Sequence, residues 1–116
     1  MSSHGDLQQW RAESQPGRTV VTLTGELDVS SVDEVRGLLA DTVRATPVVD
    51  VDLTGLTFID STILGALIAA HRDAASLGGS LTLLNPTGHV RRVLIVTGVL
   101  PLLGADKPGS ARAEVP

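Results

Sequence analysis

The hydrophobic positions of this chain recur first every second residue and later at helical spacing. In "RTVVTLTG" (18–25), Val21 and Leu23 face one side and their neighbours face the other. This alternation predicts a strand rich in β-branched residues. The preceding "LQQWRAES" is a weaker strand pattern, and "QPG" at 15–17 predicts the turn between them. The N-terminal part is therefore expected to form a β-hairpin.

A helical pattern follows in "SSVDEVRGLLADTVRA" (30–45). Its apolar residues are spaced as one face of an α-helix: Val32, Val35, Leu38, Leu39 and Val43. Ser31 followed three residues later by Glu34 predicts a capping box at the start of this helix. The next segment, "VVDVDL" (48–53), alternates again and predicts a strand.

The second half of the chain repeats this order of strand and helix. We expect a helix from about Ser61 to Leu77, ended by the two glycines that follow it. "SLTLLN" (80–85) predicts a strand, and "PTGHVRRVLIVTG" (86–98) predicts a third helix ended by its last glycine. "VLPLL" (99–103) is expected to be a short extended segment or the end of that helix.

Strands that alternate with helices imply crossover units with parallel strands. We therefore predict a single α/β domain with a mixed, largely parallel sheet and helices packed on it. Its expected boundaries are a flexible N-terminus at 1–5, the domain at 6–103 and a disordered tail at 104–116. The stretch "TGLTFIDS" is expected to be a loop at the carboxyl end of a strand, where ligands and partners commonly bind in such sheets.

Composition narrows the possible functions. A net charge of −4, with one Trp, one Phe and no Tyr, argues against binding to nucleic acid through phosphates or stacked bases. The absence of cysteine excludes disulfides and thiolate sites. The sequence predicts no secretory signal and no membrane span. A cytoplasmic protein is expected, with any membrane role exercised through a partner.

Enzymatic signatures are weak. A serine nucleophile elbow needs glycines two residues before and after the serine, but Ile59 and Ile63 flank Ser61. The three histidines are far apart and suggest neither a base nor a metal site, and no P-loop is present, so no cofactor is expected. The carboxylate pairs Asp50 with Asp52, or Asp28 with Asp60, remain possible acid and base groups, although Asp50 and Asp52 fit a solvated strand face better.

Asp60, Ser61 and Thr62 form a polar cluster where the second helix begins. One of them, Asp60 or Ser61, is expected to cap the helix. A cap requires a single residue, so at least one hydroxyl is left free. A free hydroxyl at a helix N-terminus is a favourable place for a phosphate, because unpaired amides and the helix dipole receive its charge. Such a phosphate would block an interface there without unfolding the domain.

Four features in order carry a resemblance to a known family: "GELD" at 25–28 after a strand, the helix that follows it, "VDVDLTGLTFIDSTILGAL" at 49–67 and "GGSLTLLNPTGHVRRVLIVTGV" at 78–99. Together they resemble the STAS domain, and more narrowly the free-standing bacterial anti-sigma factor antagonists. The resemblance implies partner switching. An unphosphorylated antagonist binds a kinase-type anti-sigma factor and frees a sigma factor. Phosphorylation of the antagonist by that anti-sigma factor ends the binding, and a phosphatase restores it.

Carried over to this chain, the resemblance implies that Ser61 is the phosphoacceptor. It assigns partner binding to residues around Ser61 and on the second helix: Asp28, Asp60, Thr62, Ile63 and Leu64. Ile63 stands where the family commonly has glycine, and a β-branched side chain adds bulk next to the hydroxyl. This residue either narrows the range of kinases or marks a domain that is no longer phosphorylated.

Two other functions remain open. One is a stand-alone STAS subunit of a membrane transport complex, which docks on an ATPase without being phosphorylated. The other is a small enzyme that uses Ser61 or the carboxylates. Intact Asp60 and Ser61 favour the antagonist, because a transport subunit needs no phosphoacceptor.

Overall fold

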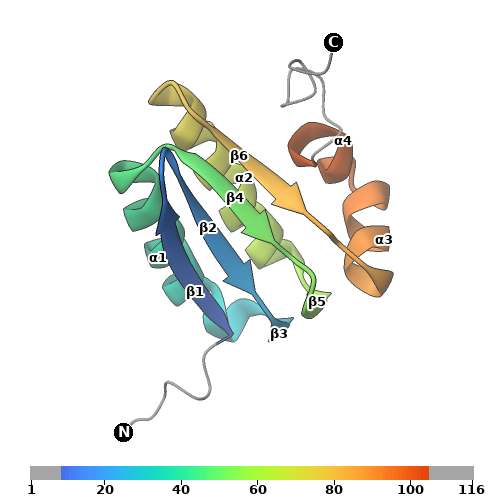
Figure 1. The fold of residues 1–116 in the computed structure, drawn as a ribbon. Helices are drawn as coiled ribbons and strands as arrows, with labels where there is room; N and C mark the ends of the chain where they lie inside the picture. Colours follow the sequence, from blue (N-terminus) through green and yellow to red (C-terminus); the bar gives the residue numbers. More distant parts are fainter. Residues whose placement is uncertain (1–8, 105–116) are drawn as a thin grey trace, which may run out of the picture.

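The computed structural model describes residues 9–104 (Figure 1). The predicted flexible N-terminus at 1–5 lies outside the described residues, as does the predicted tail from residue 105 onward. Gly104, the first residue assigned to that tail, is buried and forms a parallel bridge with Leu83. The fold therefore continues at least to this glycine.

The main sheet has four strands in the order β1-β2-β4-β6: β1 (Trp10–Gln15), β2 (Arg18–Leu23), β4 (Val48–Asp52) and β6 (Ser80–Leu84). β1 and β2 form the expected antiparallel hairpin, and β2, β4 and β6 are parallel. Val21 and Leu23 of β2 are completely buried, while Val20 and Thr22 are half-buried, as the alternation predicts. The predicted α/β class with a mixed, largely parallel sheet is confirmed.

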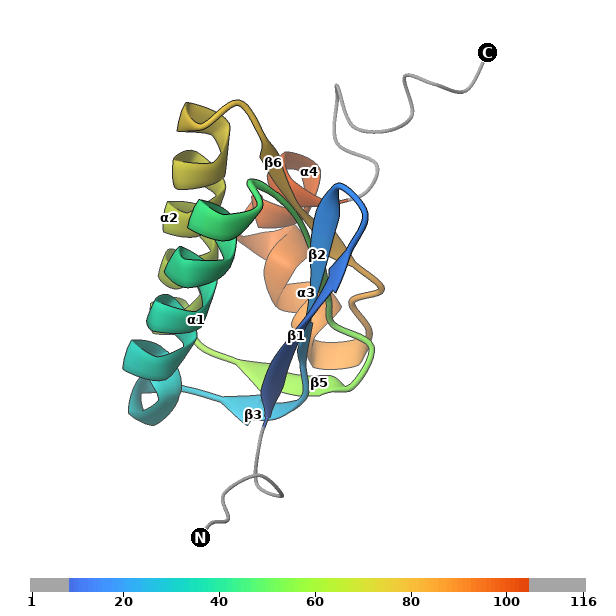
Figure 2. The same cartoon turned by 60° about the vertical axis from the view of Figure 1, so that its left-hand side comes forward.

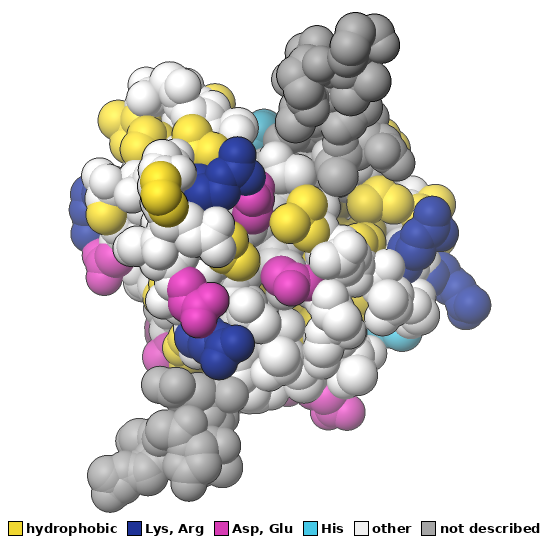
Figure 3. All heavy atoms as spheres, viewed as in Figure 1, with side chains coloured by type: hydrophobic (Ala, Val, Ile, Leu, Met, Phe, Trp, Pro, Cys, Tyr) yellow, Lys and Arg dark blue, Asp and Glu magenta, His cyan; other side chains and the backbone are white. Residues whose placement is uncertain are grey.

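Two long helices, α1 (Val32–Ala45) and α2 (Ser61–Ser76), cover one face of this sheet (Figure 2). The strands turn alternate apolar side chains toward them: Val21, Leu23, Val49, Val51, Leu81 and Leu83. Burial of each such side chain stabilises the fold by about 1.5–3 kcal/mol. Within the described residues, no helix covers the other face of the sheet, where charged, polar and apolar side chains are mixed (Figure 3).

The C-terminal part forms two short helices, α3 (Gly88–Val96) and α4 (Val99–Leu103), beside the β6 edge (Figure 1). α3 contacts β5 (Leu56–Ile59), the short strand directly before α2, and α4 contacts β6. Gly78 after α2 and Gly98 after α3 adopt positive φ angles of 82° and 80°, so both predicted glycine stops are confirmed. The segment "VLPLL" is a separate helix and not an extended segment.

A second, two-stranded sheet was not predicted. β3 (Gly25–Leu27) and β5 (Leu56–Ile59) are parallel and lie side by side below the main sheet in Figure 1. The expectation that "TGLTFIDS" is entirely a loop is therefore wrong, since its central part is β5. Gly25, the first residue of β3, has a φ of 75°, and this backbone conformation lets the chain turn directly from one sheet into the other.

The predicted capping box at α1 is also wrong. Ser31 makes no side-chain capping hydrogen bond and has a helical backbone conformation. A 3₁₀ helix, η2 (Val29–Ser31), precedes α1 directly, and Asp28 caps it by accepting a hydrogen bond from the backbone N–H of Ser30. The helical region thus starts three residues before α1. Ser31 therefore lies inside this region and not at its N-terminus, where the backbone amides are free.

Among residues 9–104, no helix is both long and apolar enough to cross a membrane.

Candidate functional site

The two short strands place Asp28 and Asp60 at the same edge of the molecule. Leu27 at the end of β3 pairs with Ile59 at the end of β5. Because these strands are parallel, the next residue of each, Asp28 and Asp60, follows at a matching position. The segment that follows β3 therefore begins beside the residue that precedes α2.

Asp60 is the N-cap of α2. Its Oδ1 accepts hydrogen bonds from the backbone N–H of Thr62 at 3.1 Å and of Ile63 at 3.2 Å, and from the Thr62 hydroxyl at 2.6 Å. These bonds, with the Thr62 hydroxyl as the largest cause, hold the pKa of Asp60 below its usual value. Of the two capping candidates in the sequence, Asp60 is therefore the cap.

Ser61 is the exposed member of the polar cluster. The Thr62 hydroxyl already donates to Asp60, whereas the Ser61 hydroxyl makes no hydrogen bond within residues 9–104. No histidine or carboxylate of this part of the chain is hydrogen-bonded to Ser61, as it would be in an activated serine nucleophile. The arrangement leaves one accessible hydroxyl at a helix N-terminus, where a phosphate is well accommodated.

Asp28 lies at this edge of the molecule and also stabilises the turn before α1. Its Oδ1 accepts hydrogen bonds from the Ser30 backbone N–H at 2.9 Å and from the Ser30 hydroxyl at 2.6 Å. These bonds fix the turn that leads into α1. Val29, which lies between Asp28 and Ser30 in the sequence, is 64% exposed.

Ile63 and Leu64, which the resemblance assigns to partner binding, face the core. The side chain of Ile63 is completely buried and that of Leu64 is 7% exposed. The assignment of these two residues to partner binding stays a prediction, and their burial favours an indirect effect through the position of α2. The bulk of Ile63 lies in the core, while the Ser61 hydroxyl faces solvent.

Phe58 and His89 are surface residues that the sequence analysis did not identify as a site. Their rings stack with centroids 5.4 Å apart and an interplanar angle of 2°. Phe58 is on β5, two residues before Asp60, and His89 is in the first turn of α3. The two residues are far apart in the sequence, and only the contact of α3 with β5 brings them together. The signal available in the sequence was the single Phe of the chain, two residues before the polar cluster.

The carboxylates of β4 are engaged in structural interactions. Asp50 forms an ion pair with Arg18. Asp52 accepts hydrogen bonds from the hydroxyl and backbone N–H of Thr54 and from Asn85, and the Thr54 hydroxyl is the largest cause of its lowered pKa. These contacts agree with a strand face that stabilises neighbouring loops.

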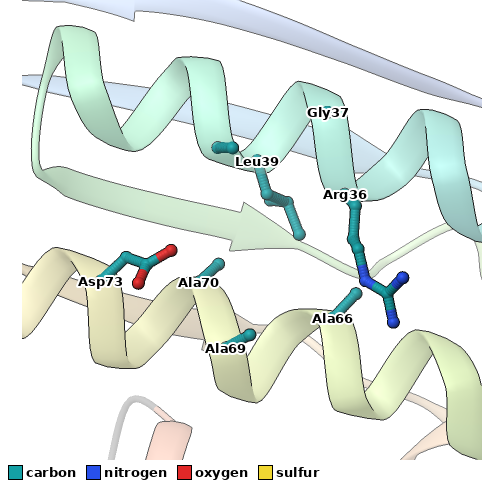
Figure 4. A pocket seen from close by; sticks show the side chains of 8 residues that line it. Arg36, Gly37, Leu39, Ala66, Ala69, Ala70 and Asp73 are labelled. Carbon is teal, nitrogen blue, oxygen red and sulfur yellow. The ribbon is translucent and has the colours of Figure 1, made fainter.

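A groove of about 320 Å³ runs between α1 and α2 (Figure 4). It is lined mainly by small residues, with Arg36 and Asp73 near its two ends. None of the residues assigned to the site from the sequence lines this groove. The predicted site therefore lies apart from this groove, at the edge around the start of α2.

Comparison with known proteins identifies the family to which this chain belongs. Residues 10–104 match the family model described as "Mlab, STAS domain". The anti-sigma F factor antagonist of Lysinibacillus sphaericus is 31% identical over 84 residues, which cover 71% of this chain and 72% of that protein.

Two solved structures of SpoIIAA have the same fold. The structure of unphosphorylated SpoIIAA, an anti-sigma factor antagonist, matches with a TM-score of 0.73 and 26% sequence identity. The match covers 82% of this chain and 84% of the SpoIIAA chain. The structure of phosphorylated SpoIIAA from Bacillus matches with a TM-score of 0.68 and 24% sequence identity. This match covers 90% of this chain and 96% of the SpoIIAA chain. The resemblance drawn from the sequence motifs is thus confirmed, and this chain belongs to the STAS domain family as a relative of the anti-sigma factor antagonists.

Proposed function

We propose that this protein is an anti-sigma factor antagonist controlled by phosphorylation of Ser61. In its unphosphorylated form it binds a kinase-type anti-sigma factor in the cytoplasm, which releases a sigma factor. The anti-sigma factor phosphorylates Ser61 and thereby ends the binding, and a phosphatase removes the phosphate. The protein itself acts as a binding partner and not as an enzyme.

The observation that carries this proposal is the difference between the two hydroxyls of the cluster. The Thr62 hydroxyl is 2.6 Å from the Asp60 carboxylate and donates to it. The Ser61 hydroxyl is exposed and makes no hydrogen bond in the described part of the chain. A kinase therefore meets only one accessible acceptor in this turn.

The position also explains how a phosphate can change binding without unfolding the domain. The group adds about −1.5 to −2 charges. In the free protein, the N-terminal end of α2 stabilises this charge and solvent hydrates it. In a complex, the same phosphate must lose its hydration beside the carboxylates of Asp60 and Asp28, which opposes docking.

Ile63 does not block access to the acceptor. Its side chain is completely buried, on the side of α2 that faces the core. Of the two interpretations of this departure from the family pattern, burial favours a domain that remains open to phosphorylation. The glycine common in the family would here leave a cavity in the core.

The phosphorylation step is tested with purified protein, ATP and each kinase-type anti-sigma factor of the source organism. Mass spectrometry should find a single phosphate on Ser61, absent from Ser61→Ala. Ser76→Ala is the matched control, because it removes another exposed serine from the far end of the same helix. If none of these kinases binds or modifies the wild-type protein, the proposal is wrong.

The alternative, a STAS subunit docking on the ATPase of a membrane transport complex, has a different signature. It requires binding to an ATPase with no modification of Ser61. Stable binding to such an ATPase by both the wild-type protein and Ser61→Ala, together with no binding to any anti-sigma factor, would favour it.

A further inference from the structure

The outer face of the β3–β5 sheet carries an exposed aromatic surface. Glu26 of β3 and Phe58 of β5 are register partners, and both side chains are exposed. The ring of His89 from α3 stacks on Phe58 in parallel. We call Glu26, Phe58 and His89 together the aromatic face.

This surface is not explained by the needs of the core. The first and last residues of β5, Leu56 and Ile59, are 1% and 3% exposed, whereas Phe58 is 37% exposed. α3 is already held by the buried side chains of Val90 and Leu94. The imidazole of His89 thus lies over a partly exposed apolar ring without being required to anchor the helix. Exposed aromatic groups of this kind are enriched among the residues that dominate protein–protein binding.

The aromatic face is continuous with the Ser61 site. Phe58 is connected to the Asp60 cap through a single residue, and Glu26 is two residues before Asp28. Exposed Val29 adjoins the same edge, because it directly follows Asp28. Apolar groups and carboxylates therefore alternate over one surface that begins at the phosphoacceptor.

We propose that the aromatic face is the apolar anchor of the surface that binds the anti-sigma factor. The partner places an aliphatic or aromatic side chain against the Phe58–His89 stack and a basic side chain toward Glu26. This inference rests on the proposed function, and it extends the docking surface from the start of α2 across β5 to the first turn of α3.

The test measures the affinity of the kinase-type anti-sigma factor that binds the wild-type protein, using calorimetry with the full-length variants. His89→Ala should weaken binding at least about fivefold, and Phe58→Ala should weaken it more. Glu26→Lys should also weaken binding, because it places a positive charge toward the partner's basic group. Leu77→Ala is the control: Leu77 is 55% exposed at the opposite end of α2, and its truncation should change the affinity less than about twofold.

His89→Ala keeps the test informative if Phe58→Ala loses stability, because His89 is exposed and its removal leaves the core intact. One outcome would overturn only this inference: the wild-type protein binds, Ser61→Asp does not bind, and both His89→Ala and Phe58→Ala bind like the wild type. The aromatic face would then not be an anchor. If the wild-type protein binds no anti-sigma factor at all, the proposed function fails and this inference fails with it.

Discussion

The carboxylate of Asp60 holds the hydroxyl of Thr62 at 2.6 Å, and this contact leaves its neighbour Ser61 as the accessible hydroxyl of the turn. The same carboxylate oxygen also accepts hydrogen bonds from the backbone N–H groups of Thr62 and Ile63. Helix capping and acceptor selection are thus performed by one side chain.

Replacing Asp60 by alanine should remove the N-cap of α2. Two backbone donors would lose their acceptor, so the free energy of unfolding should fall by about 1–2 kcal/mol. Urea denaturation followed by circular dichroism measures this change. Asp60→Asn keeps an oxygen acceptor and should lose less; equal losses in the two variants would contradict a capping role.

Thr62→Val should raise the pKa of Asp60 toward its ordinary value, because it removes the largest cause of the lowered pKa. A carboxyl group whose pKa is lowered by folding stabilises the protein above its unfolded pKa of about 3.9. That contribution is lost as the pH falls through the folded pKa.

The wild-type protein should therefore exceed Thr62→Val in unfolding free energy by about 1 kcal/mol at neutral pH. The difference should shrink in acid, below the folded pKa of Asp60. Carbon-detected NMR titration of the Asp60 carboxyl, combined with urea unfolding across the pH range, measures both effects. An unchanged Asp60 pKa in Thr62→Val would show that the hydroxyl contact has no electrostatic effect.

Ile63→Gly, which restores the glycine common in the family, should strongly destabilise this protein. The variant empties a completely buried site and introduces glycine into the first turn of α2. Cavity formation and the helix penalty together predict a loss of about 3–5 kcal/mol. Ile63→Val is the conservative control and should lose about 1 kcal/mol. A stable Ile63→Gly protein would mean that the core relaxes around the missing side chain.

The larger elements were predictable because their patterns are long. α2 carries enough turns for its apolar spacing to be seen, and its start was marked by Asp60 and Ser61. The same reasoning missed β3 and β5, since strands of three and four residues are too short for alternation to be distinguished from loop sequence.

The site was only partly predictable. The sequence places Asp60, Ser61 and Thr62 in one turn, but it does not decide which of them is the cap or which hydroxyl stays free. The direction of the Ile63 side chain depends on how α2 packs on the sheet, so its bulk was expected beside Ser61 and lies in the core. The Phe58–His89 stack requires the packing of α3 on β5, which no local pattern encodes.

Ser61→Asp should weaken binding to the anti-sigma factor while leaving the thermal unfolding midpoint nearly unchanged. The new carboxylate lies at the N-terminus of α2, where the helix dipole favours negative charge, but it repels an incoming partner that must also cover Asp60. Calorimetric titration and thermal unfolding of the same sample give the two values. A large loss of stability would instead indicate that the Ser61 hydroxyl has a structural role.

Control of partner binding by a phosphate on Ser61 is measured by comparing the two forms of one protein. The anti-sigma factor is titrated with unphosphorylated protein and with protein carrying one phosphate on Ser61. We predict that the phosphate weakens binding at least about tenfold, and that phosphatase treatment restores the original affinity. Equal affinities of the two forms would show that phosphorylation of Ser61 does not control partner binding.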